Sequence, residues 1–202
     1  MREAHEAILV IDVQNDFCPG GALAVAGGDE IVAPINAMVP EFPIRVFTQD
    51  WHPAQHKSFA SQHSGSDPFT LTNMPYGPQV LWPDHCVIGS DGADFHPGLD
   101  TRLADLIVRK GFRPSIDSYS AFFENDRTTP TGLDGYLRSR GTTKVTLVGL
   151  ATDYCVAYSA LDAARLGYDV TVIESLTRPI DLDGSLDAQR SAMQAAQIQI
   201  GG

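Results

Sequence analysis

Five short apolar runs, rich in β-branched residues, constrain the fold of this sequence more than any other feature. They cover residues 7–12, 44–50, 106–110, 144–150 and 169–175. None alternates strictly between apolar and polar residues, which is typical of strands buried on both faces of a sheet. Helical segments are predicted at 29–42, 132–141, 152–167 and 185–197, and 198–200 is a candidate sixth strand. The pattern predicts an α/β fold: a mostly parallel sheet of about six strands with helices on both faces.

Length and charge narrow the class of protein. A chain of 202 residues is long enough for a sizeable core, and we expect one domain over 1–202. The formal net charge of -11 argues against nucleic acid and anionic membrane surfaces as partners. The longest apolar runs are too short to span a bilayer, and acidic residues interrupt any signal-peptide pattern at the N-terminus. Three widely spaced cysteines favour a reducing cytoplasm over a disulfide framework.

The stretch from about 51 to 105 departs from this regular alternation. It is rich in Gly, Pro, Ser and His, and it holds five of the six histidines of the chain, at positions 52, 56, 63, 85 and 96. Loops of this length are usually functional or disordered. The concentration of histidines favours a functional loop region that contributes to an active site or a metal site.

Reactive residues follow several of the predicted strands. Asp12 and Lys110 stand at the ends of two runs, and Cys155 follows the turn after a third. Ligands bind at the carboxyl ends of the strands in open α/β sheets. Each residue alone has an ordinary explanation: a turn aspartate, a solvated lysine, a packed cysteine. As a group they offer a nucleophile (Cys155), a proton acceptor (Asp12) and a cation (Lys110). The cation favours the carboxylate and the thiolate over their protonated forms. The first turn of a helix would also lower the pKa of the thiol.

The turn before Cys155, with the sequence GLAT, is the obvious place for an oxyanion hole. Backbone N–H groups at the start of a helix can hold a developing negative charge on a substrate oxygen. We expect the amides of Ala151 and Cys155 to supply these donors.

A second group of residues has the chemistry of a metal site. Asp50 and His52 are two apart, so they point to the same side of an extended chain, and His85 follows about thirty residues later. Such a set suits one divalent transition metal ion with open positions. His56 is a further candidate ligand, and Cys86 could compete as a soft ligand. The alternative is a polar loop whose histidines bind nothing.

Five motifs in order along the chain resemble the nicotinamidases of the isochorismatase-like cysteine hydrolase superfamily. They are AILVIDVQNDFCPGGALAV, TQDWHPAQHKSFAS, LWPDHCV followed by ADFHPGLD, VRKG followed by DSYSAF, and GLATDYCV. The resemblance covers nearly the whole chain. It implies a three-layer α/β/α domain that hydrolyses nicotinamide to nicotinate and ammonia through a cysteine thioester, and that also accepts pyrazinamide-like carboxamides.

The resemblance also implies a role for each matching residue. Asp12 matches the general base, Lys110 the catalytic lysine and Cys155 the nucleophile. Asp50, His52 and His85 match the ligands of a metal ion, which is zinc, iron or manganese in such enzymes, and zinc is the ion we expect here. Aromatic residues that flank the substrate ring match Phe17, Trp82 and Tyr119. The peptide bond before Ala151 is cis in relatives, which would turn the Ala151 amide toward the oxyanion.

Other functions remain open at this point. Another amide or carbamoyl hydrolase of the same superfamily is the nearest alternative. A more distant one is a non-catalytic protein that binds zinc or senses redox state through Cys155. The sequence leaves undecided which metal is bound, whether the chain is a monomer or a homo-oligomer, how broad the substrate range is, and whether Gly202 is the natural C-terminus.

Overall fold

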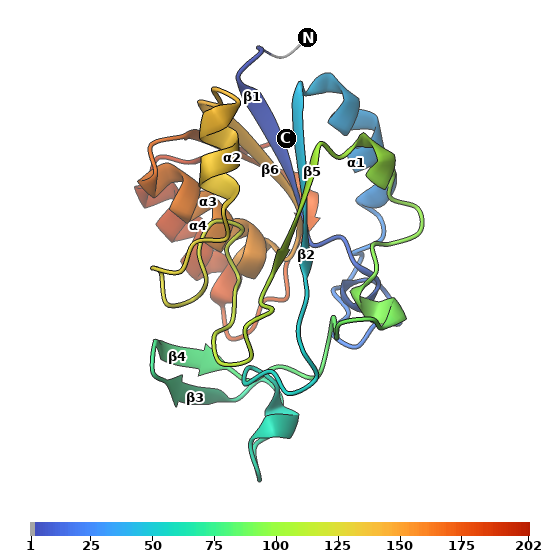
Figure 1. Cartoon of the computed structure of the whole chain (residues 1–202), viewed down its shortest axis with the longest axis vertical. Coiled ribbons are helices and arrows are strands. Elements are labelled where there is room, and N and C mark those ends of the chain that lie inside the picture. The colour runs from blue at the N-terminus through green and yellow to red at the C-terminus, as the bar shows by residue number, and fades with distance from the viewer. Residues whose placement is uncertain (1–2) are drawn as a thin grey trace.

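A computed structural model describes residues 3–202 and contains one six-stranded sheet with helices packed on it (Figure 1). The strands of this sheet are β1 (Glu6–Ile11), β2 (Ile44–Asp50), β5 (Leu106–Lys110), β6 (Lys144–Leu150), β7 (Asp169–Arg178) and β8 (Gln199–Gly201). The main helices are α1 (Val32–Met38), α2 (Leu133–Ser139), α3 (Ala157–Arg165) and α4 (Ser185–Ala195). A separate antiparallel hairpin consists of β3 (Leu71–Met74) and β4 (Gly77–Val80).

The sheet is parallel throughout, in the order β5-β2-β1-β6-β7-β8. Its centre is apolar on both faces: residues 7–11 of β1 and 145–150 of β6 are all buried. Figure 1 shows α1 on one side of the sheet and α2, α3 and α4 on the other. The predicted single α/β domain, with about six parallel strands and helices on both faces, is confirmed.

The order of strands reverses direction between β1 and β6. From β1 the chain builds outward through β2 to β5, whereas from β6 it builds the other way through β7 to β8. A crevice opens beyond the carboxyl ends of the strands at such a switch point. Asp12 directly follows β1 and Ala151 directly follows β6, so both residues lie at this position.

Local structure differs from the sequence prediction in three places. The helix expected over 29–42 is shorter, because only Val32–Met38 is α-helical and a 3₁₀ turn follows at Val39–Glu41. The helix expected from residue 152 begins with a π-helical turn, Thr152–Val156, that holds Cys155. The region 51–105 contains the unpredicted β3–β4 hairpin, whose residues lack a clear alternating pattern. Within residues 3–202, no helix is both long and apolar enough to cross a membrane.

Gly149 brings β6 into close contact with the end of β1. Its φ is +115°, and a Cβ atom at this position would lie 2.1 Å from the carbonyl oxygen of Ile11. Both the backbone conformation and the space therefore require glycine. This contact fixes the spacing between the segment that carries Asp12 and the turn that leads to Cys155.

We expect Gly149→Ala to lower the free energy of unfolding by about 3 kcal/mol or more, because it combines a clash with a disfavoured φ. Urea unfolding followed by circular dichroism measures the change. Gly135→Ala in α2 is the matched control, because a Cβ at Gly135 meets nothing within 4 Å. That control should be neutral or stabilising, since alanine is the better helix former. Equal stability of the two variants would contradict the proposed contact.

Candidate active site

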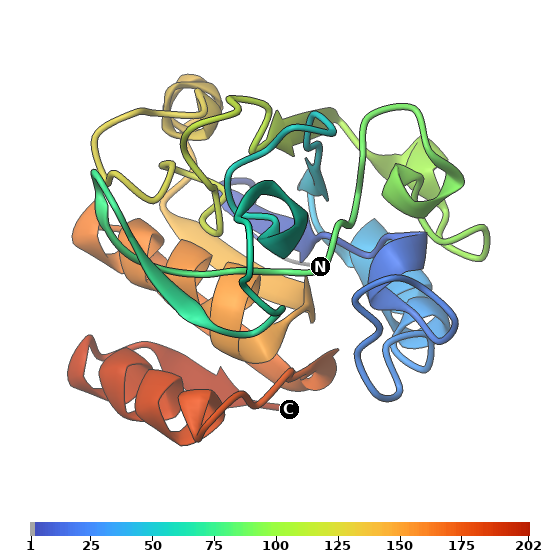
Figure 2. The ribbon, with the colours of Figure 1, turned by 90° about the horizontal axis from the view of Figure 1, so that it is seen from below.

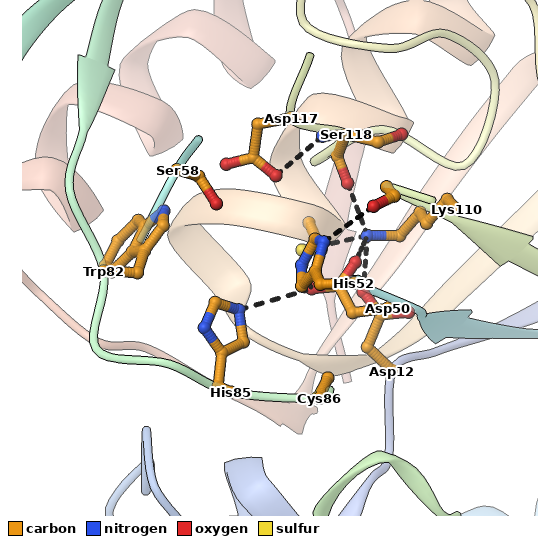
Figure 3. Close-up of polar contacts among 12 residues, drawn as sticks. Asp12, Asp50, His52, Ser58, Trp82, His85, Cys86, Lys110, Asp117 and Ser118 are labelled. Atoms are coloured by element: carbon orange, nitrogen blue, oxygen red, sulfur yellow. Dashed lines mark hydrogen bonds and ion pairs between the residues drawn. The ribbon is translucent and has the colours of Figure 1, made fainter. Parts of the chain in front are cut away.

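Asp12, Lys110 and Cys155 come together at the carboxyl edge of the sheet, and Figure 3 shows the first two of them side by side. Lys110 Nζ lies 2.9 Å from Asp12 Oδ2 and 3.4 Å from Cys155 Sγ. All three residues are buried. The structure therefore brings together the three residues that the sequence analysis placed in one group.

The Lys110 ammonium is held by more than these two neighbours. It donates to Asp50 Oδ1 at 2.5 Å and to the carbonyl oxygen of Ser118 at 2.7 Å. Burial acts to lower the pKa of Lys110, but the charges of Asp12, Asp50 and Cys155 outweigh it and raise the pKa well above its usual value. Lys110 is therefore a fixed cation between carboxylates, and it is not a proton donor at neutral pH.

The Asp12 carboxylate is positioned by Thr48 on the neighbouring strand β2. The Thr48 hydroxyl donates to Asp12 Oδ1 at 2.6 Å, and the Asp12 amide donates to the Thr48 hydroxyl at 3.2 Å. Burial raises the pKa of Asp12, although Lys110 and Thr48 act against this shift. A buried carboxylate with a raised pKa is a better proton acceptor than an ordinary aspartate.

The pKa of the Cys155 thiol differs from the lowering that the start of a helix predicts. Burial raises its pKa well above the usual value, and the charge of Lys110 only partly offsets this effect. The resting thiol therefore carries its proton. Because only the thiolate attacks well, a proton acceptor beside the sulfur is required, and Asp12 lies in that place.

Asp50, His52 and His85 converge beside this group (Figure 3). One possible ligand atom from each lies within 4.8 Å of the other two. The Nε2 atoms of His52 and His85 are 3.7 Å and 3.9 Å from Asp50 Oδ2. His52 Nε2 is buried, and it has no hydrogen-bond partner among residues 3–202. An unpaired, buried imidazole nitrogen aimed at a carboxylate fits a metal ligand.

The other ring nitrogen of each histidine is engaged by a backbone carbonyl. His52 Nδ1 is 2.8 Å from the Gly111 oxygen, and His85 Nδ1 is 2.8 Å from the Pro83 oxygen. A carbonyl can only accept, so each Nδ1 carries the proton and each Nε2 presents its lone pair. A side chain at Gly111 would lie 2.4 Å from the His52 ring, so glycine is needed for this approach.

His56 and Cys86 lie outside this set. The His56 Nδ1 atom contacts the Ser58 hydroxyl at 2.7 Å and accepts from the Ser58 amide at 3.2 Å, while its Nε2 lies 3.1 Å from the Ile116 oxygen. Both nitrogens are thus engaged, although a second possible grouping joins His52, His56 and Asp117. Cys86 belongs to none of the three possible metal groupings within residues 3–202, and burial raises the pKa of its thiol well above the usual value.

The turn before Cys155 has the backbone form that the resemblance implies. The peptide bond between Leu150 and Ala151 is cis. The carbonyl oxygen of Ala151 accepts from the amides of Tyr154 and Val156, so it points into the π-helical turn. The assignment of the Ala151 and Cys155 amides as oxyanion donors stays a prediction.

A cavity connects these groups, with about 310 Å³ of empty space, part of it open to solvent. The residues that line it are Phe17, Leu23, Asp50, Trp82, His85, Asp117, Tyr119, Ala151, Tyr154, Cys155 and Ile180. The Trp82 indole donates to the Tyr119 hydroxyl at 3.1 Å, and the rings of Trp82 and Tyr154 are 4.9 Å apart. The three predicted aromatic residues thus line one cavity, together with the sulfur and two members of the metal set. Its aromatic walls suit a flat ring.

Sequence reasoning missed several residues of this site. Asp117 is buried, lines the cavity and accepts from the Gln79 side chain at 2.7 Å. It stands in the same DSYSAF motif as Tyr119, which was the available signal. Tyr154 is adjacent to Cys155 in sequence. Thr48 lies two residues before Asp50 on β2, so the alternation of side chains along the strand could have indicated it.

Comparison with known proteins identifies the family. The isochorismatase domain model matches residues 6–199. A curated nicotinamidase from Acinetobacter baylyi is 52% identical over 200 residues, which cover 98% of this chain and 94% of that protein. The chain belongs to the nicotinamidases of the isochorismatase family.

Solved structures of nicotinamidase relatives share the whole fold. A nicotinamidase/pyrazinamidase from Acinetobacter baumannii superimposes with a TM-score of 0.98 at 50% identity, covering 100% of this chain and 97% of that one. A pyrazinamidase from Pyrococcus horikoshii, solved in complex with zinc, gives a TM-score of 0.77 at 32% identity, with 97% and 98% covered.

The ion pairs of Lys110 predict a strong effect on the stability of this nicotinamidase-family chain. Lys110→Met leaves Asp12 and Asp50 buried without their counter-ion, so we expect the free energy of unfolding at pH 7.5 to fall by about 3 kcal/mol or more. Lys144→Met removes an exposed lysine that pairs with Glu3, and its effect should be far smaller. Urea unfolding of both variants measures the difference.

The same variant should show a characteristic pH dependence. Without Lys110, burial and mutual repulsion raise the folded-state pKa values of Asp12 and Asp50 above those of the unfolded chain. A group with a raised folded pKa loses its contribution to stability as the pH rises through that pKa. The deficit of Lys110→Met relative to the unaltered chain should therefore be smaller at pH 5 than at pH 7.5. A deficit that is independent of pH would argue against buried carboxylates as its cause.

Proposed function

We propose that this chain hydrolyses the carboxamide of nicotinamide to nicotinate and ammonia, with Cys155 as the nucleophile. The observation that carries the proposal is the contact between the Cys155 sulfur and the Asp12–Lys110 ion pair beside a cavity lined by aromatic residues. The family supports the substrate, since the nicotinamidase from Acinetobacter baylyi shares half of the sequence.

The shape of the cavity supports a pyridine or pyrazine carboxamide as substrate. Phe17, Trp82 and Tyr119 offer aromatic faces to a flat ring, and the sulfur of Cys155 lines the same cavity. The Acinetobacter baumannii relative is named as both a nicotinamidase and a pyrazinamidase. We therefore expect pyrazinamide to be a substrate as well.

The first half of the reaction forms a thioester. Asp12 takes the proton of the Cys155 thiol as the sulfur attacks the amide carbon, and the electron pair of the carbonyl moves to its oxygen. The amides of Ala151 and Cys155 hold this oxyanion. When the carbon–nitrogen bond breaks, protonated Asp12 gives its proton to the leaving nitrogen, which departs as ammonia. The Lys110 cation keeps Asp12 available as a carboxylate at the start of this cycle.

The second half releases the acid. Asp12 accepts a proton from water as the water oxygen attacks the thioester carbon. Collapse of the second oxyanion breaks the carbon–sulfur bond, and Asp12 returns a proton to the departing sulfur. The free acid ionises to nicotinate, and the resting thiol is restored.

Asp50, His52 and His85 would hold one divalent transition metal ion, and zinc fits this set of one carboxylate and two imidazoles. Zinc is also present in the structure of the Pyrococcus horikoshii pyrazinamidase. An ion bound there supplies a Lewis acid that can hold the ring nitrogen of the substrate. This chain's residues prepare the position: Gly111 and Pro83 fix the two rings, and Lys110 neutralises the other oxygen of Asp50.

The properties of the thiol weigh against a redox sensor. A sensor cysteine needs a low pKa and solvent access. Cys155 is buried, and its pKa is raised well above the usual value.

Cys155→Ala should reduce the rate of ammonia release from nicotinamide by about 10⁴-fold or more, because no other group can form the thioester. The measurement is a coupled ammonia assay under reducing conditions with added zinc. Cys18→Ala is the control, since Cys18 is also buried but lies outside the cavity described above. Full turnover by Cys155→Ala would exclude Cys155 as the nucleophile.

Substitution of the metal set should separate metal loss from loss of the nucleophile. We expect His85→Ala and His52→Ala to lose bound zinc, whereas Cys155→Ala keeps it. His56→Gln and His63→Ala should also keep it, because both histidines lie outside the set of Asp50, His52 and His85. Elemental analysis of each purified variant after dialysis gives the zinc content. Stoichiometric zinc in His85→Ala, or its absence from His56→Gln, would require a different ligand set.

A further inference from the structure

Gln79 stands behind the wall of the cavity that contains the Cys155 sulfur. It belongs to the β3–β4 hairpin, which Figure 2 shows running alongside α3. Among the residues of β3 and β4 it is the only buried one, and its side chain is 1% exposed. Gln79 does not line the cavity itself. A polar side chain enclosed in this way needs partners inside the protein.

The Gln79 amide forms hydrogen bonds with two residues of the cavity wall. Its Nε2 atom donates to Asp117 Oδ2 at 2.7 Å and to the Tyr119 hydroxyl at 2.9 Å. The carbonyl oxygen of Val80 lies 2.8 Å from the same nitrogen. Asp117 and Tyr119 both line the cavity beside Cys155. The hairpin therefore reaches the wall of the active site through this amide.

The direction of the Gln79 amide is fixed by its other neighbours. The backbone amide of Tyr119 donates to Asn125 Oδ1 at 3.0 Å, so Asn125 presents its Nδ2 atom to Gln79. Gln79 Oε1 accepts from this Nδ2 at 3.2 Å and from the Tyr76 hydroxyl at 3.1 Å. Because two donors occupy Oε1, the Nε2 atom is turned toward Asp117 and Tyr119.

The Tyr119 hydroxyl joins two aromatic side chains of the cavity. It accepts from Gln79 and also from the Trp82 indole, at 3.1 Å. The rings of Tyr119 and Trp82 meet edge to face with their centroids 6.2 Å apart, and Tyr154 packs against both. Hydrogen bonds are strongly directional, so the two bonds at this hydroxyl set how the rings of Tyr119 and Trp82 stand relative to each other.

We propose that Gln79 is a positioning residue for the ring of the substrate, an inference that rests on the proposed hydrolysis of nicotinamide. The amide holds Tyr119 in the orientation in which its ring and that of Trp82 flank the substrate. The hydrogen bonds of Gln79 reach this wall rather than the Cys155 sulfur. Loss of the amide therefore weakens binding of the ring more than it slows the chemical step.

Gln79→Met tests the proposal, because methionine has nearly the same length but cannot donate a hydrogen bond. In the ammonia assay with added zinc, we expect the KM for nicotinamide to rise about tenfold, while kcat changes less than about threefold. Gln79→Leu should give the same rise, which separates lost hydrogen bonds from a change of shape. Asn73→Met on β3 is the matched control, since Asn73 is exposed and does not line the cavity.

A double-mutant cycle shows whether Gln79 acts through Tyr119. Tyr119→Phe keeps the ring and removes the hydroxyl that accepts from Gln79. Isothermal titration of nicotinamide into zinc-loaded chains that carry Cys155→Ala gives the dissociation constant without turnover. We expect Gln79→Met and Tyr119→Phe each to weaken binding. The double variant should bind about threefold or more tighter than the product of the two single effects, because both remove the same hydrogen bond.

The outcomes distinguish this proposal from the proposed function. No ammonia from the unaltered chain would contradict the hydrolysis itself. Circular dichroism and thermal unfolding show whether each variant is folded, and Tyr119→Phe breaks the same bond if neither Gln79 variant folds. In an active chain, an unchanged KM in folded Gln79→Met, a loss confined to kcat, or an unchanged dissociation constant in Tyr119→Phe would overturn the role of Gln79. Single effects that multiply without coupling would also overturn it.

Discussion

The buried ammonium of Lys110 is the interaction on which the rest of the site depends. Removing an ion from water costs several kcal/mol, and partners with good geometry must offset that cost. Here the partners are the carboxylates of Asp12 and Asp50, together with the Ser118 carbonyl. The strand order β5-β2-β1-β6 explains how they meet, because these neighbouring strands end at or lead into Lys110, Asp50, Asp12 and Cys155. The ends of four neighbouring strands therefore bring one buried cation, two carboxylates and one thiol into contact.

This arrangement explains why the sequence was so informative about the centre of the site. Buried parallel strands read as apolar runs, and their carboxyl ends meet at one edge of the sheet. Polar residues that directly follow such runs can therefore be grouped from the amino-acid sequence, and Asp12, Asp50 and Lys110 follow from that rule. Cys155 needed the additional interpretation of a turn that leads into a helix, and the role of each residue came from the resemblance between whole motifs.

The parts that sequence reasoning missed depend on long-range contacts. The β3–β4 hairpin has short strands with polar and proline residues, which give no periodic signal, and its Gln79 acquires meaning only through its bond to Asp117. The pKa of the Cys155 thiol also differs from the lowering expected at a helix N-terminus, because burial raises it and the charge of Lys110 only partly offsets this effect. Burial is a property of the folded whole, and no local pattern reports its magnitude.

The two oxygens of Asp50 face different partners, which limits the substitutions that position 50 can accept. Oδ1 accepts a hydrogen bond from the Lys110 ammonium, while Oδ2 faces His52 and His85. Histidine could bind an ion but carries no negative charge for the lysine, cysteine has only one ligand atom, and asparagine would keep the shape without the charge. A change of ion at this site can therefore be accommodated by substitution at positions 52 and 85, whereas position 50 requires an acid as long as a lysine occupies position 110.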